Sequence, residues 1–161
     1  MDEPTLHPAL EPLAFLLGVW RGEGRGHYPT IEDFAYGEES RFWHTGRPVM
    51  AYAQRTWNLA EGTAMHGEMG FWRPQPDGVV EVVLTHTFGM VEMAEARVEG
   101  TKISLRSTSL QPTPSAKPVG AEARVLEVQD DVLTYMMQLE AAGQTLQAHL
   151  EARLARVSPT A

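Results

Sequence analysis

Glycine and proline interrupt this chain at fairly regular intervals, and they separate short runs in which apolar and polar residues alternate. Many of them fall in turn-forming clusters, such as the Thr-Gly-Arg-Pro of residues 45–48 and the Pro-Asp-Gly of residues 76–78. Alternation with a period of two is the pattern of a β-strand with one buried face, and glycine and proline form the turns between such strands. The pattern therefore predicts many short strands rather than helices.

Ten runs fit this pattern, and no helical segment between them is long enough for the crossover that a parallel sheet requires. Ten strands in hairpin order predict an all-β fold, an antiparallel up-and-down β-barrel, because closure leaves no exposed sheet edge. The predicted strands are Val19–Gly24, Phe34–His44, Val49–Leu59, Met65–Arg73, Val79–His86, Met90–Val98, Ile103–Leu110, Ala121–Gln129, Val132–Leu139 and Leu146–Arg156.

Two segments depart from the strand pattern. In His7–Leu17 the apolar residues recur every three or four positions, Pro8 suits the first turn of a helix, and Gly18 suits its C-terminal cap. We expect a short N-terminal helix that closes one end of the barrel. The segment Gln111–Gly120 contains three prolines and is predicted to be an exposed loop.

The composition limits the setting in which the chain can work. A length of 161 residues suits a single domain, 1–161, with its own core. The absence of cysteine removes disulfides and thiolate metal sites and predicts a reducing compartment, the cytoplasm. No apolar run approaches the ~20 residues of a membrane span, and no secretory leader is recognisable. A net charge of -8 with scattered basic residues argues against nucleic acid as a partner.

Histidine is the main chemical resource of the chain, with six residues. His86 shares its strand face with Val82 and Leu84 and should point into the interior, either as a hydrogen-bonded core residue or as a ligand. His149 is harder to place, because strict alternation puts it on the face opposite the leucines of its strand. Only a β-bulge, or a barrel mouth beside this strand, would turn His149 inward.

The glycine-rich segment that begins at Gly18 resembles a phosphate loop only superficially, because its glycines occur at strand spacing and no amphipathic helix follows. Such glycines allow close approach either by another strand or by a ligand, and both interpretations stay open. Trp20 is expected to plug one barrel end. The sequence shows no nucleophile elbow and no carboxylate pair placed for acid–base work, since Glu38 and Glu39 are adjacent and should point to opposite faces.

A series of motifs runs in order along the chain. The first is Gly-x-Trp-x-Gly-x-Gly, formed by Gly18, Trp20, Gly22 and Gly24. The others are residues 28–31 (Tyr-Pro-Thr-Ile), 36–39 (Tyr-Gly-Glu-Glu), 46–49 (Gly-Arg-Pro-Val), 70–74 (Gly-Phe-Trp-Arg-Pro), 76–78 (Pro-Asp-Gly) and 146–150 (Leu-Gln-Ala-His-Leu). As a set they resemble the nitrobindin family of haem-binding β-barrels, and the resemblance covers about residues 8–157.

The resemblance implies a ten-stranded antiparallel barrel, similar in shape to fatty-acid-binding proteins and lipocalins, that holds one b-type haem per chain without a covalent bond. It places the axial iron ligand at His149 in the last strand, which is why a local distortion is required there. The other residues that it implies for the haem pocket are Met65, His66, His86 and Leu139, with Thr30 reaching the haem from an early loop.

Members of the family bind nitric oxide at ferric haem and are described as isomerising peroxynitrite to nitrate. The resemblance therefore implies a haem-dependent peroxynitrite isomerase whose partners are these two small molecules, with His149 acting in catalysis through the iron. One imidazole ligand fits this chemistry because it leaves one iron position open. The second ring nitrogen of His149 needs a hydrogen-bond acceptor, which the sequence does not identify.

Two other interpretations of the barrel stay open. One is a carrier of fatty acid or another apolar molecule without catalytic activity, although the predicted inward faces carry no paired basic residues to receive a carboxylate. The other is a non-haem metal site made of His66, His86 and His149, since three histidines can hold zinc or iron, although these three show no ligand spacing. A flat side of the barrel could also form a homodimer.

Overall fold

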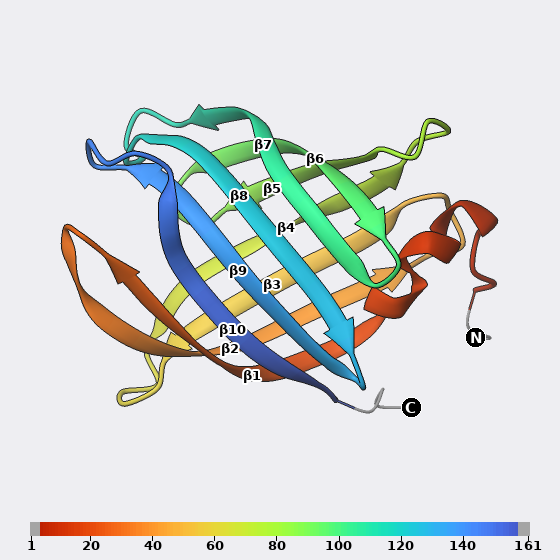
Figure 1. Ribbon diagram of the computed structural model, residues 1–161, viewed down its shortest axis with the longest axis horizontal. Coiled ribbons are helices and arrows are strands. Elements are labelled where there is room, and N and C mark those ends of the chain that lie inside the picture. The colour runs from red at the N-terminus through yellow and green to blue at the C-terminus, as the bar shows by residue number, and fades with distance from the viewer. Residues whose placement is uncertain (1–3, 158–161) are drawn as a thin grey trace.

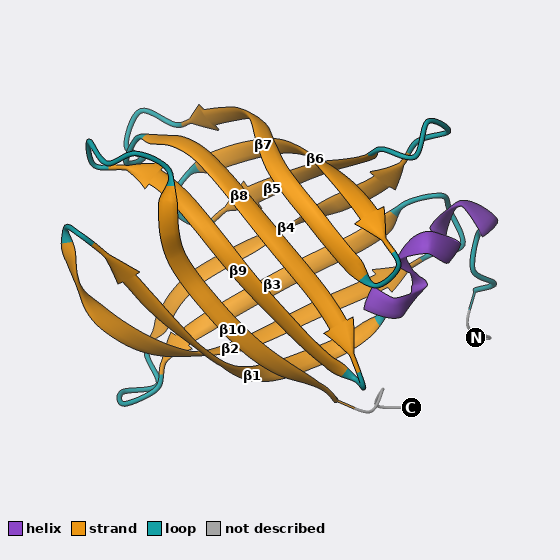
Figure 2. Ribbon diagram, in the orientation of Figure 1, coloured by secondary structure: helices purple, strands orange, loops and turns teal. Residues whose placement is uncertain are grey.

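The strands form one closed barrel in the computed structural model, which describes residues 4–157. Consecutive strands pair in antiparallel fashion, and the first strand closes the ring by pairing with the last (Figures 1 and 2). The predicted ten-stranded up-and-down barrel is confirmed. Its strands are β1 (Gly18–Tyr28), β2 (Ile31–His44), β3 (Met50–Asn58), β4 (Ala64–Pro74), β5 (Val80–His86), β6 (Met90–Glu99), β7 (Lys102–Pro112), β8 (Val119–Gln129), β9 (Val132–Ala141) and β10 (Gln147–Val157).

The strand ends differ from the prediction most clearly in the first hairpin. β1 ends at Tyr28 rather than at Gly24, because Gly26 still pairs with both neighbouring strands. The loop between β7 and β8 covers residues 113–118 and is shorter than predicted, because Pro112 still belongs to the ladder with β6. Glycine and proline therefore mark these turns less sharply than their usual preferences suggest.

A 3-10 helix, η1 (Pro8–Leu16), covers one end of the barrel, close to the position predicted from its leucine spacing (Figure 2). Leu10, Leu13 and Leu16 are fully buried and belong to the main apolar cluster of the barrel interior. Trp20 of β1 is also fully buried, and its Nε1–H donates a hydrogen bond to the carbonyl oxygen of Leu16 at 2.8 Å. This end of the barrel is sealed by apolar packing.

Two glycines of the Gly-x-Trp-x-Gly-x-Gly motif let β1 lie very close to its neighbours. A Cβ added at Gly22 would lie 2.1 Å from the carbonyl oxygen of Arg153 in β10, and one at Gly24 would lie 2.3 Å from the ring of Tyr36 in β2. No side chain fits at such distances, so only glycine can occupy these positions. Of the two interpretations of this motif, the geometry supports close approach of strands.

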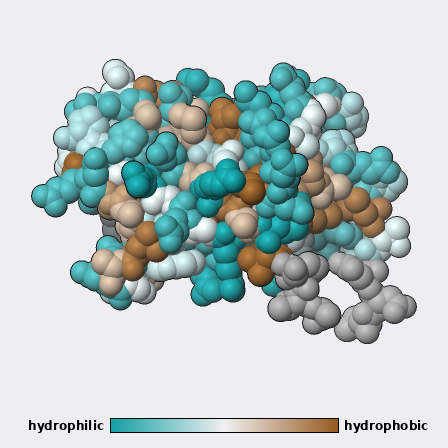
Figure 3. Space-filling model, turned by 60° about the horizontal axis from the view of Figure 1, so that its bottom comes forward, coloured by the Kyte–Doolittle hydropathy of each residue, from teal (hydrophilic) through white to brown (hydrophobic). Residues whose placement is uncertain are grey.

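The outer surface carries mostly hydrophilic residues, with apolar patches between them on the face shown in Figure 3. Exposed apolar side chains include Met69 and Phe71 of β4 and Met136 of β9. Formation of a homodimer through such a face stays a prediction. Within residues 4–157, no helix has the length and apolar character needed to cross a membrane.

Candidate functional site

A cavity of about 690 Å³ is lined in part by residues of the β7–β8 and β9–β10 loops. These loops lie at the end of the barrel opposite η1 (Figure 1). The cavity wall is apolar over much of its extent and carries charged and hydrogen-bonding side chains over the rest. The apolar lining residues are Phe34, Met65, Phe88, Pro118, Val119, Met137, Leu139, Ala141, Ala142 and Leu150. A mainly apolar pocket with a few convergent polar groups is typical of a small-molecule or cofactor site.

The structure brings most of the predicted pocket residues together. The lining includes Met65 and His66 of β4, His86 of β5, Leu139 of β9 and His149 of β10.

Thr30 lies instead in the exposed turn between β1 and β2 and does not line the cavity. A contact between Thr30 and a bound molecule therefore stays a prediction.

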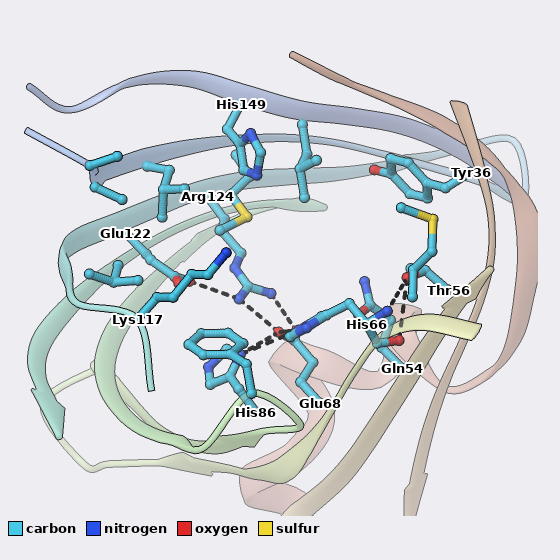
Figure 4. Close-up of a pocket in the computed structure, with 18 of the residues that line it drawn as sticks. Tyr36, Gln54, Thr56, His66, Glu68, His86, Lys117, Glu122, Arg124 and His149 are labelled. Atoms are coloured by element: carbon cyan, nitrogen blue, oxygen red, sulfur yellow. Dashed lines mark hydrogen bonds and ion pairs between the residues drawn. The ribbon is translucent and has the colours of Figure 1, made fainter. Parts of the chain in front are cut away.

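The strand that carries His149 contains a β-bulge at this residue. Ala148 pairs with Gln138 and Leu150 pairs with the next residue of β9, Met137. His149 is therefore an extra residue of β10 that has no pairing partner in β9. An inserted residue breaks the alternation of faces and redirects the side chain. The outward orientation that strict alternation indicated is therefore wrong, and His149 points into the cavity (Figure 4).

The environment of His149 holds the imidazole in one orientation. Its Nδ1 lies 3.0 Å from the carbonyl oxygen of His27 in β1, so Nδ1–H donates this hydrogen bond and Nε2 is left without a proton. The ring also makes an edge contact with Tyr28, at 5.3 Å between centroids. Burial lowers the pKa of His149, which favours the neutral imidazole that coordinates metals. The acceptor that sequence reasoning left unnamed is thus the backbone of His27.

The opposite wall of the cavity holds a buried ion-pair cluster around Arg124 of β8 (Figure 4). The guanidinium donates to both carboxylate oxygens of Glu68 in β4, to Glu122 at 3.1 Å, and lies 3.6 Å from Glu92 of β6. His86 joins this cluster, since its Nε2 lies 3.1 Å from Glu92 and its Nδ1 lies 3.3 Å from Glu68. Buried charges are tolerated in proteins when they are paired in this way.

The cluster shifts the pKa values of its members in different directions. Burial alone would raise the pKa of Glu68, but the Arg124 charge and the hydrogen bonds to its carboxylate hold the pKa well below 4.5. Burial raises the pKa of Glu122 above 4.5 despite the same guanidinium. Burial lowers the pKa of His86, but the hydrogen bond to Glu92 and the Glu68 charge raise it above 6.5 overall. His86 therefore keeps its proton to a higher pH than a free imidazole, and Glu122 keeps its proton to a higher pH than a free carboxyl group.

A second buried network lies beside the first. The hydroxyl of Tyr135 donates to one oxygen of Glu38, and Ser40 donates to the other at 2.7 Å. The hydroxyls of Tyr135 and Tyr36 are 2.7 Å apart, and both rings line the cavity. Glu38 is buried, whereas Glu39 pairs with arginines on the outer face, so the prediction that these neighbours point to opposite faces is confirmed.

Sequence reasoning found no carboxylate pair, yet the structure places three carboxylates around Arg124. The signal that could have revealed these carboxylates is the position of a charged residue on the apolar face of an alternating strand. Glu92 stands between Met90 and Ala94 on the inward face of its strand, and all three are buried. A charged residue at an inward position must find a partner inside the barrel, but the sequence does not tell which strand supplies it.

The non-haem metal site of His66, His86 and His149 is not assembled. His66 and His86 lie together, but His149 lies across the cavity from them (Figure 4). In the described part of the chain, the group that joins His66 and His86 contains Glu68 in place of His149. That prediction failed because sequence spacing carries no information about which strands face each other across the barrel.

Comparisons with known proteins find relatives over nearly the whole chain. The family described as THAP4-like, heme-binding beta-barrel domain matches residues 9–156. "Peroxynitrite isomerase 1" of Mycolicibacterium paratuberculosis is 48% identical over 159 residues, which cover 95% of this chain and 98% of that protein. A peroxynitrite isomerase from Arabidopsis thaliana is 43% identical over 155 residues, which cover 95% of this chain and 92% of that protein.

A solved structure shows the same fold. The crystal structure of Rv2717c from M. tuberculosis matches with a TM-score of 0.89 at 41% identity, and the match covers 95% of this chain and 99% of that chain. A family match over nearly the whole chain and a shared fold at this identity lead to one conclusion. The chain belongs to the THAP4-like, heme-binding beta-barrel family, the nitrobindins that its motifs resemble.

Proposed function

We propose that the cavity binds one b-type haem without a covalent bond, that His149 is its axial ligand, and that the loaded protein binds nitric oxide and isomerises peroxynitrite to nitrate. Membership of the heme-binding family supports the cofactor, and the names of the relatives support the reaction. The single structural observation that carries the proposal is the bulge in β10, which directs a neutral imidazole into a mainly apolar cavity.

The residues present fit such a cofactor. The unprotonated Nε2 of His149 is a suitable iron ligand, and its Nδ1–H is already held by the His27 carbonyl, as is usual for metal-ligating histidines. The apolar side chains of Phe34, Leu139 and Leu150 suit the faces of a flat macrocycle. Lys117, in the β7–β8 loop, lines the same cavity and carries the positive charge that a haem carboxylate would pair with.

When bound, ferric haem supplies a Lewis acid with one position open to a diatomic molecule or a small oxyanion. The role of the chain's own residues would be to bind and orient the cofactor. His149 would hold the cofactor from one wall, and the apolar lining would exclude water from the cavity. His66 and His86 line the opposite wall of the same cavity.

Absorbance spectroscopy tests the cofactor assignment. The full chain reconstituted with ferric haem should show a Soret band, and the band should shift or disappear in His149→Ala. His44→Ala is the matched control, because His44 lies at the end of β2 and does not line the cavity. A Soret band that is identical in His149→Ala and in the unmodified chain would contradict the axial role of His149.

Stopped-flow kinetics test the reaction. The decay of peroxynitrite should accelerate in proportion to the haem-loaded protein, with nitrate as the product, and the haem-free chain should give no acceleration. Titration of the loaded protein with nitric oxide should shift the Soret band. If loading with haem adds nothing to the decay rate, the protein binds haem without the proposed activity.

A carrier of fatty acids has less support. Of the two basic side chains that line the cavity, Lys117 could receive a fatty carboxylate as well as a haem carboxylate, whereas the guanidinium of Arg124 is already paired with Glu68 and Glu122. A fatty carboxylate that approached this guanidinium would have to displace a buried carboxylate and would meet three negative charges there, which costs more than the new ion pair returns.

A further inference from the structure

The side chains of His66, Glu68 and His86 place three metal-ligating atoms in a compact triangle on the wall of the cavity opposite His149 (Figure 4). The Nε2 of His66 lies 3.4 Å from the Oε2 of Glu68 and 3.4 Å from the Nδ1 of His86, and that Nδ1 lies 3.3 Å from the same carboxylate oxygen. We propose that these three residues bind a divalent transition-metal ion, such as Zn²⁺, at a site separate from the haem iron.

The size of the triangle matches four-coordinate geometry. Zinc binds imidazole nitrogen and carboxylate oxygen at about 2.0–2.2 Å, and in a tetrahedron the ligand atoms are then about 3.3–3.6 Å apart. All three edges of the observed triangle are 3.3 or 3.4 Å. Two histidines and one carboxylate are a common ligand set for catalytic zinc and for non-haem iron. Little movement of the side chains is therefore required to receive the ion.

One contact in the triangle lacks a hydrogen between its two atoms when His86 is neutral. The Nε2–H of His86 donates to Glu92, so its Nδ1 presents a lone pair to the Oε2 of Glu68 at 3.3 Å. That oxygen already accepts a hydrogen bond from Arg124 at 2.9 Å, and the Nε2–H of His66 can serve the Nδ1 of His86 at 3.4 Å. A cation inside the triangle would accept the lone pairs of all three ligand atoms at once.

The surroundings of the triangle resemble the outer shell of a metal site. Glu92, which is fully buried, accepts from the Nε2 of His86 at 3.1 Å, and a carboxylate in this position fixes the tautomer and raises the basicity of a metal-ligating histidine. The hydroxyl of Tyr52 donates to the other oxygen of Glu68 at 2.8 Å. Glu68 is therefore held so that one oxygen faces the triangle.

The cluster holds more acidic than cationic side chains. The carboxyl groups of Glu68, Glu92 and Glu122 surround the one guanidinium of Arg124, and this excess of acidic groups favours a bound cation. Metal ligands must lose their protons, so metal ions and protons should compete for the site. The titratable and charged groups that face it are Tyr52 of β3, His66 and Glu68 of β4, His86 of β5, Glu92 of β6, and Glu122 and Arg124 of β8.

An ion can reach the triangle from the cavity. The side chain of His66, which lines the cavity, is 33% exposed, whereas those of Glu68 and His86 are almost fully buried, so an ion would approach the triangle past His66. The fourth position of a bound ion would face the cavity and accept water or a small anion. His149 is not one of the ligands, so the site does not depend on the proposed haem function.

Equilibrium dialysis tests the site. The full chain, with and without haem, is dialysed against Zn²⁺. Elemental mass spectrometry then measures the amounts of zinc and iron bound per chain. We expect one zinc per chain in both forms, at least a tenfold weaker affinity in His66→Ala, and no change in His44→Ala, whose histidine lies outside the cavity. Lowering the pH from 8 to 6 should weaken zinc binding by the unmodified chain.

The outcomes separate this site from the haem site and from a folding defect. His66 is the most exposed of the three ligands, so His66→Ala should fold, and circular dichroism checks this. The unmodified chain, free of haem and loaded with Co²⁺, should show the intense visible absorption bands of a four-coordinate ion. The proposal is overturned if the chain binds no zinc, if His66→Ala binds it equally well, or if the cobalt spectrum is that of a six-coordinate ion. None of these results bears on the Soret band.

Discussion

The two ends of the barrel use the same strands in opposite ways. At the end covered by η1, the interior is filled by apolar side chains such as Leu13 and Trp20, which are fully buried. At the other end the interior is left partly empty, and the side chains that face the space include histidines, carboxylates and Arg124. The packed end stabilises the fold through burial of apolar surface, whereas the desolvation of buried charges at the open end lowers the stability. Substitutions should therefore act differently at the two ends.

The largest effect is expected at Arg124. In Arg124→Met the carboxylates of Glu68 and Glu122 would stay buried without their cation, and the loss of a buried ion-pair partner costs about 3–5 kcal/mol. Urea unfolding at pH 7 measures this loss. Arg106→Met, at an exposed position of β7, should change the unfolding free energy by no more than about 0.5 kcal/mol. If the two variants lose the same unfolding free energy, Arg124 does not stabilise buried carboxylates as described above.

The closed end should respond through packing alone. Leu13→Ala would leave a cavity beneath η1 and lower the unfolding free energy by about 2–5 kcal/mol. The Soret band of the haem-loaded protein should not change, because Leu13 does not line the cavity. Leu59→Ala, at a 40% exposed position, is the control and should cost clearly less. An altered Soret band in Leu13→Ala would show that the two ends are coupled.

The open end should also show a dependence on pH that the closed end lacks. Because the folded-state pKa of His86 is raised above 6.5, its protonated form stabilises the fold fully below pH 6.5, and this contribution is lost as pH rises through the folded pKa. The difference in unfolding free energy between the unmodified chain and His86→Gln should therefore shrink from pH 6 to higher pH. A difference that grows over this range would contradict the raised pKa.

The smallest effect on stability is expected at His149 in the haem-free protein. His149→Ala removes one side-chain hydrogen bond from a half-buried residue, so the unfolding free energy should fall by about 0.5–1.5 kcal/mol. In the haem-loaded protein the same substitution should also remove the stabilisation that the bound cofactor provides. Thermal unfolding of both forms measures the two contributions. If His149→Ala costs as much as Leu13→Ala without haem, His149 is a packing residue.

The sequence predicted the barrel well and the site only in part. Alternation identified all ten strands because each strand has one face in the interior and one outside. The same rule misplaced His149, because a bulge is a local exception that alternation does not reveal. The cluster around Arg124 was missed, since its members come from β4, β6 and β8, and only the closed sheet shows that these strands face one another.

The bulge in β10 also has a consequence for the order of folding. The contact that orients His149 joins it to the carbonyl of His27, 122 residues earlier in the chain. This contact forms only when the last strand docks against the first, which is the least local pairing in the barrel and carries a high entropic cost of loop closure. A chain that has not yet closed its barrel therefore does not hold the imidazole of His149 in this orientation.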